Sequence, residues 1–390
     1  MDPRKNPYAP GAGTPPPELA GRDDLIERAA IALDRIRAGR AARSLVLHGL
    51  RGVGKTVLLN RIETDAEARS FACVKVEAPE DRSLPALLTP VLRVALLRLD
   101  RGKRMRANLA RAGRALAGFA RALKVKYRDI EVSTDFEPER GLADSGDLDT
   151  DLTDLLASVG TAAREYRTGI VLFIDELQYL HEDQLASLIR ALHSASQRQL
   201  PMTMLAAGLP QLIGQMGRAK SYAERLFEFV PIDPLDDEAA RTALSVPAKR
   251  EGVAFTPEAI AEILRQTMGY PYFLQEWGRH AWNVAKTSPI SRADARRATV
   301  LALAELDAGF FRVRFDRLTP TEKRYLGAMA ELGPGPHRSG DIAERLGKSV
   351  TSVAPVRSEL IGKGVIYSPA HGDTAFTVPL FDGFMTRIVA

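Results

Sequence analysis

The sequence SLVLHGLRGVGKT at residues 44–56 constrains the fold of this chain more than any other stretch. Its apolar start predicts a buried strand, and apolar residues with helical spacing follow the glycine-rich part. That part matches the pattern G-x-x-x-x-G-K-[ST], in which backbone N–H groups surround phosphate oxygens, while the lysine reaches the β- and γ-phosphates and the hydroxyl binds Mg²⁺. The strand–loop–helix context favours a nucleotide site over an ordinary glycine turn. The residues assigned to it are Gly49, Leu50, Arg51, Gly52, Val53, Gly54, Lys55, Thr56 and Val57.

A second informative stretch, GIVLFIDELQYL, occupies residues 169–180. Five consecutive apolar residues at 170–174 predict a strand buried on both faces of a parallel sheet. Asp175 and Glu176 follow at its carboxyl end, where such sheets bind ligands. We expect Asp175 and Thr56 to hold Mg²⁺, and Glu176 to orient and deprotonate the attacking water while Lys55 acts on the phosphates. The simpler alternative is that the two acids only end a strand and begin a helix.

Composition places the chain among ordinary globular proteins. It has 390 residues, of which 45% are hydrophobic and 26% charged, so two or three domains are expected. No apolar run approaches the roughly 20 residues of a membrane-spanning helix, and the N-terminus lacks the apolar core of a secretory signal. The single cysteine, Cys73, cannot form an internal disulfide. A cytoplasmic location is therefore expected.

Charge is distributed unevenly although the formal net charge is only +5. Residues 98–128 carry eleven Lys and Arg against one Asp, whereas residues 129–154 carry ten acids against one Arg. This charged insert, at about residues 98–149, interrupts the alternation of strands and helices, and its basic half has the pattern of an amphipathic helix containing Gly113 and Gly118. Three interpretations remain open: an intramolecularly neutralised face, a nucleic-acid contact and a membrane-surface helix.

The order of elements predicts four parts. Residues 1–17, rich in proline and glycine, are expected to form a flexible arm. Residues 18–235 are expected to form an α/β nucleotide-binding core, a doubly wound parallel sheet of five strands of the P-loop NTPase type. The pattern then becomes helical over residues 236–304, which predicts a small lid. Residues 305–390 contain three helices followed by a hairpin, which predicts a winged helix with a helix-turn-helix.

With both nucleotide motifs and the C-terminal part placed, the chain resembles the AAA+ ATPases, in particular the branch similar to the origin-recognition initiators. The segment ELAGRDDLIE is similar to the family's entry motif, which implies that Leu19, Gly21 and Arg22 border the adenine base. The segment SYAERLFEF resembles the one that holds the arginine finger, which implies that Arg225 donates charge to the γ-phosphate, from a neighbouring copy if the chain is a homo-oligomer.

Two departures from that family pattern concern polar groups near the γ-phosphate. Where a polar sensor commonly follows the fourth strand, this chain has Ala207 and Gly208, and Thr203 lies too early. Where the lid usually carries a second sensor arginine, this chain has Tyr272. Lid closure driven by a cation from the lid is therefore in question.

Two functions of different classes follow from these features. The first is an ATP-hydrolysing switch that binds double-stranded DNA through the winged helix, mostly by phosphate contacts. The second is a signalling or assembly ATPase whose winged helix and charged insert bind a protein partner. A metal hydrolase has little support because the six histidines show no metal-ligand spacing. The residues expected to contact DNA are Lys348, Arg357, Lys363 and the hairpin near His371.

Overall fold

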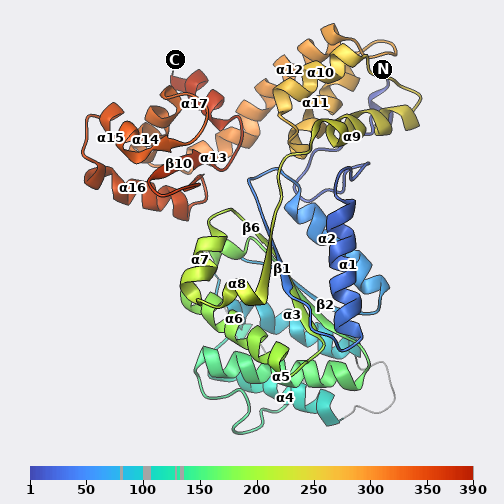
Figure 1. Cartoon of the computed structure of the whole chain (residues 1–390), viewed down its shortest axis with the longest axis vertical. Helices are drawn as coiled ribbons and strands as arrows, with labels where there is room; N and C mark the ends of the chain where they lie inside the picture. The colour runs from blue at the N-terminus through green and yellow to red at the C-terminus, as the bar shows by residue number, and fades with distance from the viewer. Residues whose placement is uncertain (80–81, 100–106, 128–129, 132–135, 390) are drawn as a thin grey trace.

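The computed structural model describes residues 1–79, 82–99, 107–127, 130–131 and 136–389. Its centre is a five-stranded parallel sheet in the order β2-β5-β6-β1-β7 (Figure 1). The register pairs Glu77 with Asp175 and His48 with Gly208, so the carboxyl ends of these strands lie at one edge. The five predicted strands and the doubly wound α/β fold are confirmed. The strands are β1 (Ser44–His48), β2 (Ala72–Glu77), β5 (Ile170–Asp175), β6 (Met202–Gly208) and β7 (Phe227–Pro231).

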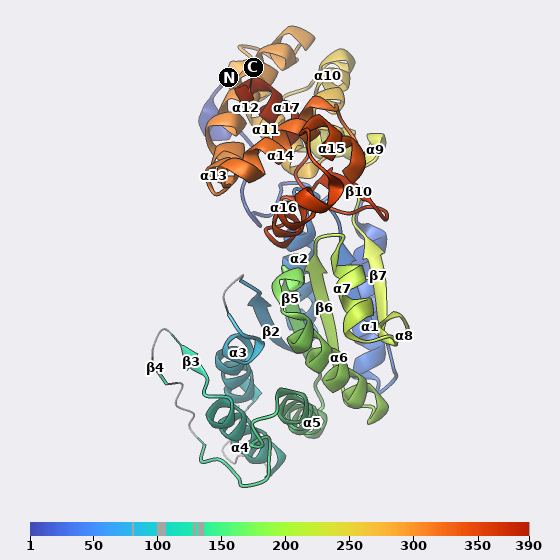
Figure 2. The same cartoon turned by 90° about the vertical axis from the view of Figure 1, so that its left-hand side faces the viewer.

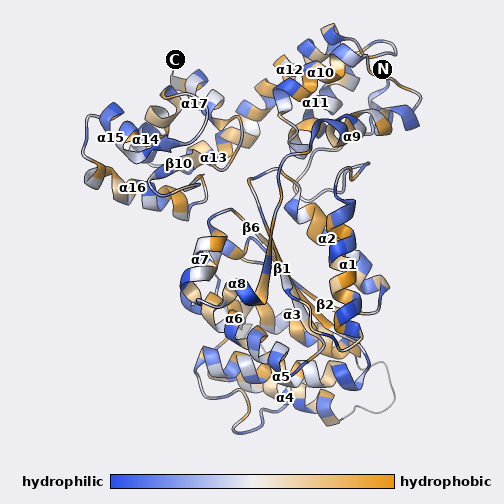
Figure 3. Ribbon diagram, in the orientation of Figure 1, coloured by the Kyte–Doolittle hydropathy of each residue, from blue (hydrophilic) through white to orange (hydrophobic). Residues whose placement is uncertain are grey.

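Helices cover both faces of the sheet because successive strand residues point to opposite sides. In β5, Val171 and Phe173 belong to the core that includes α1 and α2, whereas Leu172 and Ile174 belong to the core that includes α3 to α6. All four side chains are fully buried, and Figure 3 shows the strands as predominantly hydrophobic. The helices of this part are α1 (Asp23–Arg37), α2 (Lys55–Ala68), α3 (Leu84–Leu99), α4 (Ala107–Ala122), α5 (Leu148–Glu165), α6 (Glu182–Gln197), α7 (Leu212–Ala219) and α8 (Ala223–Leu226).

The charged insert adds a helical layer, in which α4 packs on α3 and α5 at the far side of the molecule from the lid (Figure 2). Its glycines allow close contacts: a Cβ on Gly113 would lie 2.5 Å from the Phe136 ring, and one on Gly118 would lie 2.5 Å from the Leu142 carbonyl. Arg114 pairs with Glu139 at 2.7 Å. The apolar face of α4 is buried inside the protein, which argues against a membrane-surface helix. The short strands β3 (Lys126–Tyr127) and β4 (Ile130–Glu131) follow, whereas the basic residues 101–106 lie outside the described part.

The predicted helical lid lies beyond the carboxyl edge of the sheet (Figure 1). Thr256 caps one of its helices, with Pro257 at the first position. The segment expected to be a flexible arm begins with a 3-10 turn (Pro3–Lys5) and packs on the lid: the Tyr8 side chain is buried and its hydroxyl donates to the Leu244 carbonyl. Trp282 donates its indole N–H to the Asp2 carbonyl at 2.9 Å. The lid helices are α9 (Asp237–Arg250), α10 (Pro257–Thr267), α11 (Pro271–Val284) and α12 (Arg292–Leu306).

The C-terminal part continues from α12 without a break in helical backbone, through a π-helical turn (Asp307–Phe311) into α13 (Arg312–Asp316). A small antiparallel sheet in the order β8-β10-β9 lies among its helices. Pro355 lies in the second turn of α16, so α16 lacks one backbone donor there. The remaining elements are α14 (Pro320–Glu331), β8 (His337–Arg338), α15 (Ser339–Arg345), α16 (Val350–Gly362), β9 (Ile366–Tyr367), β10 (Asp373–Phe376) and α17 (Phe381–Val389).

In the described part of the chain, no helix is both long enough and apolar enough to cross a bilayer.

Candidate nucleotide site

A cleft of about 530 Å³ lies at the carboxyl edge of the sheet, where the lid and the C-terminal part meet the core. The loop between β1 and α2 forms one wall, and Asp175 and Glu176 from the end of β5 form another. The remaining walls come from the arm, the entry motif, Tyr272 of α11 and two residues after α12, Phe310 and Arg314. The two motifs recognised in the sequence therefore face one cleft.

The phosphate loop has the backbone that its glycines allow. Gly52 and Gly54 have φ of 85° and 92°, and Gly54 caps α2, whose N-terminus points its N–H groups into the cleft. The Lys55 side chain is only 8% exposed, and its Nζ donates to the carbonyls of Gly49 at 2.9 Å and Leu50 at 2.8 Å. Burial lowers the pKa of Lys55 to about 8, with Glu176 acting in the opposite direction. Arg51, Val53, Thr56 and Val57 also line the cleft.

Oxygen ligands suited to Mg²⁺ lie at the centre of the cleft. The Thr56 hydroxyl donates to Asp175 Oδ2 at 2.6 Å, and burial raises the pKa of Asp175. A hydroxyl beside a carboxylate is a donor set that fits a hard cation with a water shell. The predicted metal residues are thus adjacent.

Glu176 lies beside this pair in a left-handed conformation, with φ of 52°. Its carboxylate accepts hydrogen bonds from Arg51 Nη1 at 3.4 Å and from the amide of Gln178. Gln178 also accepts a hydrogen bond from the Leu209 N–H at 3.0 Å, and its Oε1 would lie 2.7 Å from a Cβ on Gly208. A polar side chain therefore does occupy the end of β6, the fourth strand of the core, but Gln178 supplies it from the 3-10 turn (Leu177–Tyr179) that follows β5.

The entry motif forms another part of the cleft wall. Leu19 and Arg22 line it, and Arg22 Nη2 donates to the carbonyls of Val53 at 3.3 Å and Asp233 at 2.6 Å. Burial lowers the pKa of Arg22. Gly21 faces the lid instead, because a Cβ there would lie 2.6 Å from Ala239. Residues 9–14 of the arm also line the cleft, which the proline-rich sequence did not indicate.

Arg225 does not reach the cleft of its own chain. It lies on α8 with an exposed side chain, away from the residues that line the site. Thr203 is also remote, because its hydroxyl lies 3.3 Å from that of Ser44 inside the sheet.

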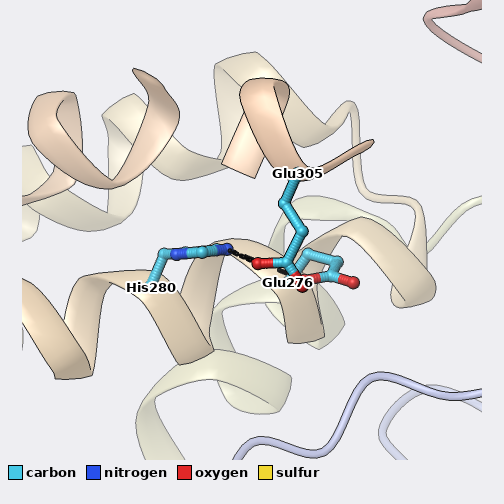
Figure 4. Close-up of side chains that lie close together, drawn as sticks. All are labelled: Glu276, His280 and Glu305. Carbon is cyan, nitrogen blue, oxygen red and sulfur yellow. Dashed lines mark ion pairs between the residues drawn. The ribbon is translucent and has the colours of Figure 1, made fainter. Parts of the chain in front are cut away.

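A separate cluster in the lid brings Glu276, His280 and Glu305 within 4.8 Å of one another (Figure 4). His280 joins this cluster from α11 together with Glu276, whereas Glu305 comes from α12. Arg279 Nη2 lies 2.8 Å from Glu276 and 2.6 Å from Glu305, so a guanidinium already neutralises these carboxylates. This arrangement is that of a structural ion-pair network between α11 and α12.

The sheet topology, the phosphate loop and the adjacent acids define a P-loop nucleotide-binding domain. Comparison with protein families agrees, because residues 18–205 match the model of the AAA ATPase domain. This part of the chain is an AAA ATPase domain. Residues 308–385 match a domain family of unknown function, DUF8462. No curated protein matches the chain.

Comparison with solved structures gives matches at low sequence identity. The Walker-type ATPase of Pyrococcus abyssi is 15% identical, with a TM-score of 0.56, and the match covers 94% of this chain and 96% of that one. The Orc1 protein of Aeropyrum pernix, solved in complex with DNA, is 16% identical, with a TM-score of 0.48 and coverage of 95% and 93%. Cdc6p of Pyrobaculum aerophilum is 14% identical, with a TM-score of 0.47 and coverage of 100% and 98%.

Proposed function

We propose that this protein is an ATP-dependent switch that binds ATP with Mg²⁺ in the cleft and hydrolyses it slowly. The observation that carries the proposal is the convergence of Lys55, the Thr56–Asp175 pair and Glu176 at one end of the sheet. Lys55 would exchange its two carbonyl partners for phosphate oxygens, and Thr56 and Asp175 would hold the metal ion, which neutralises phosphate charge when bound. Leu19 and Arg22 would border the base.

Glu176 would act as the base that orients the attacking water. Each of its two oxygens already accepts a hydrogen bond, one from Arg51 and one from Gln178, and both bonds stabilise the ionised carboxylate and so weaken it as a base. That weakening is the physical reason for proposing slow turnover.

The proposal is tested by two variants. Lys55→Ala should abolish ATP binding, whereas Glu176→Gln should bind ATP and stop hydrolysis, because an amide cannot accept the proton. Glu182→Gln is the matched control, since Glu182 is exposed on α6 and pairs only with Arg218 among the described residues. Unchanged turnover in both test variants would overturn the assignment.

We further propose that the C-terminal part is a winged helix of the origin-recognition type and that it binds double-stranded DNA. The order of α14, α15, α16 and the β9–β10 hairpin supports this proposal. Two of the predicted DNA residues have internal partners: Arg357 donates to Thr374 at 2.8 Å, and Lys363 pairs with Glu322 at 2.8 Å. Phosphate contacts would therefore fall to Lys348 and the turn around His371.

A salt titration distinguishes DNA binding from the alternative, which is binding of a protein partner. Each phosphate contact contributes a slope of about −0.9 to the dependence of log affinity on log salt. Lys348→Ala should reduce that slope by about one contact, whereas Lys249→Ala on lid helix α9 should leave it unchanged. Absent or salt-insensitive binding would favour a protein partner, which the 48% exposed Val350 at the start of α16 also fits.

The exposed position of Arg225 supports a role for this residue only in the site of a neighbouring copy. Arg225→Ala should then lower turnover without changing ATP affinity, and wild-type turnover per chain should rise with protein concentration. Turnover independent of concentration would contradict a finger acting between copies.

A further inference from the structure

The connection between the lid and the C-terminal part passes along the nucleotide cleft. The continuous helix formed by α12, the π-helical turn and α13 carries Phe310 and Arg314 into the cleft wall. The Phe310 ring stacks on that of Tyr272, with centroids 4.9 Å apart and an interplanar angle of 23°. π-helical turns widen a helix locally and are frequent at functional sites. This turn determines which side chains of the connecting helix face the nucleotide cleft.

The Arg314 guanidinium lies in this wall without an acidic partner. Its carbon lies 4.0 Å from the centre of the Phe310 ring, and its Nη1 donates to the Phe310 carbonyl at 2.5 Å. Among the described residues, no carboxylate lies within ion-pair distance of it, whereas the neighbouring Arg312 pairs with Asp316 at 3.1 Å. Burial, followed by the charge of Arg51, lowers the pKa of Arg314 to about 10, so it stays protonated at neutral pH. A half-buried cation of this kind favours an anionic ligand.

The surroundings of Arg314 identify which part of a nucleotide it would meet. Arg51, Tyr179 and Glu176 are the charged and titratable groups that act on it together with Tyr272. Arg51 belongs to the phosphate loop, and Glu176 directly follows Asp175, the partner of Thr56. Glu176 is the residue proposed to orient the water that attacks the terminal phosphate, so this phosphate is the part of the nucleotide that Arg314 would meet.

The same C-terminal part also touches the phosphate loop directly. The Arg51 N–H donates to the Thr377 carbonyl at 2.9 Å. A Cβ on Gly364 would lie 3.2 Å from Arg51 Nη2 and 3.1 Å from the Tyr179 hydroxyl, so this turn packs on the loop. Two contacts, one polar and one steric, thus connect the residues after α16 to the phosphate loop.

We propose that Arg314 binds the terminal phosphate of ATP within the same chain, and that this contact makes the position of the C-terminal part depend on the nucleotide. The proposal rests on the proposed ATP binding and extends it to regulation. ADP lacks the group that Arg314 would hold, so it would leave the connecting helix without this anchor.

Nucleotide affinities provide the test, with Arg312→Ala as the matched control on the same helix. A charge-assisted hydrogen bond predicts that Arg314→Ala weakens binding of a non-hydrolysable ATP analogue about tenfold or more and that of ADP less than threefold. Arg312→Ala should change neither. An equal loss for both nucleotides, or no loss, would overturn the role of Arg314, whereas wild-type protein that binds neither nucleotide would refute the proposed function itself.

Hydrogen exchange at residues 364–378 tests the coupling separately. In wild-type protein, the ATP analogue and ADP should give different protection of this segment, and the difference should disappear in Arg314→Ala. Equal protection in the wild type, or a difference that persists in the variant, would contradict the coupling. Thermal unfolding of both variants checks that the fold is intact.

Discussion

The pH dependence of nucleotide affinity follows from the burial of Lys55. In the ligand-free protein this ammonium is bonded to two loop carbonyls and has a pKa of about 8. Phosphate oxygens nearby would raise that pKa, because opposite charge favours the protonated form. Binding is therefore coupled to proton uptake, and affinity should fall as pH rises through the pKa of the free protein. The pH dependence of folding stability has the opposite sign, because burial disfavours the charged lysine. As pH rises from 8 to 10.5, the contribution of Lys55 to the stability of the fold increases.

The magnitude comes from the protonated fraction of Lys55 in the free protein. With a pKa of about 8, roughly nine tenths of the molecules are protonated at pH 7 and roughly one tenth at pH 9. If the bound form keeps its proton throughout, affinity falls about tenfold across this window, or about 1.4 kcal/mol. The last proton of a phosphate group dissociates with a pKa of about 6, which lies below the window from pH 7 to pH 9. Arg314, with a pKa of about 10, remains mostly protonated within it.

Isothermal titration calorimetry with ADP at pH 7, 8 and 9 measures this effect, and repeating it in buffers of different ionisation enthalpy counts the protons taken up. Lys55→Arg is the control, since a guanidinium stays charged throughout and should remove the pH dependence. An affinity that is flat between pH 7 and 9 in the wild type would refute the reasoning. A slope that persists in Lys55→Arg would place the titrating group elsewhere.

Two further predictions concern side chains whose partners the structure identifies. Gln178→Leu removes the amide that holds Glu176 and should change turnover several-fold with little change in ATP affinity. Gln184→Leu is the control: Gln184 lies on α6 and accepts a hydrogen bond from the Leu84 N–H, so turnover should stay unchanged. Steady-state hydrolysis and titration measure the two effects, and an equal change in both variants would contradict this role. Lys363→Met leaves the 1% exposed carboxylate of Glu322 without its cation and should lower the free energy of unfolding by about 2 kcal/mol, below the 3–5 kcal/mol of a fully buried pair because Lys363 is 41% exposed. Chemical denaturation measures that loss, and a variant as stable as the wild type would show the pair to be unimportant.

Local sequence patterns were sufficient to predict the five strands of the core and its two nucleotide motifs. The five strands could be predicted because each is a short apolar run bounded by turn residues, and β5 is buried on both faces as its unbroken run of apolar residues requires. The phosphate loop and the acids after β5 could be paired because parallel strands bring their carboxyl ends to one edge. These inferences needed only residues close together in the chain and one rule of sheet geometry.

The remaining site residues depend on packing between distant segments. Arg314 follows the phosphate loop by about 260 residues, and nothing in the sequence FFRVRF distinguishes it from Arg312. Their difference arises from the helical turn that directs one towards the cleft and the other towards Asp316. Gln178 could not be predicted for a related reason: the polar group at the end of β6 comes from the turn after β5, and Gly208 leaves room for it there.

The contact between Gly364 and Arg51 gives the sharpest test of communication between the C-terminal part and catalysis. Arg51 pairs with Glu176 and lies against Gly364. A Cβ at position 364 would lie 3.0 Å from Leu209 Cδ1, 3.1 Å from the Tyr179 hydroxyl and 3.2 Å from Arg51 Nη2, so these side chains would have to shift by a few tenths of an ångström and the Arg51–Glu176 pair should loosen. Gly364→Ala should therefore raise ATP turnover several-fold. Because Gly364 has φ of 63°, backbone strain of roughly 1 kcal/mol accompanies the change. Gly372→Ala is the matched control: its φ is 82°, but a Cβ there meets no described atom within 4 Å. It carries the same kind of strain without touching Arg51, so an equal effect of both variants on turnover would refute communication through this contact.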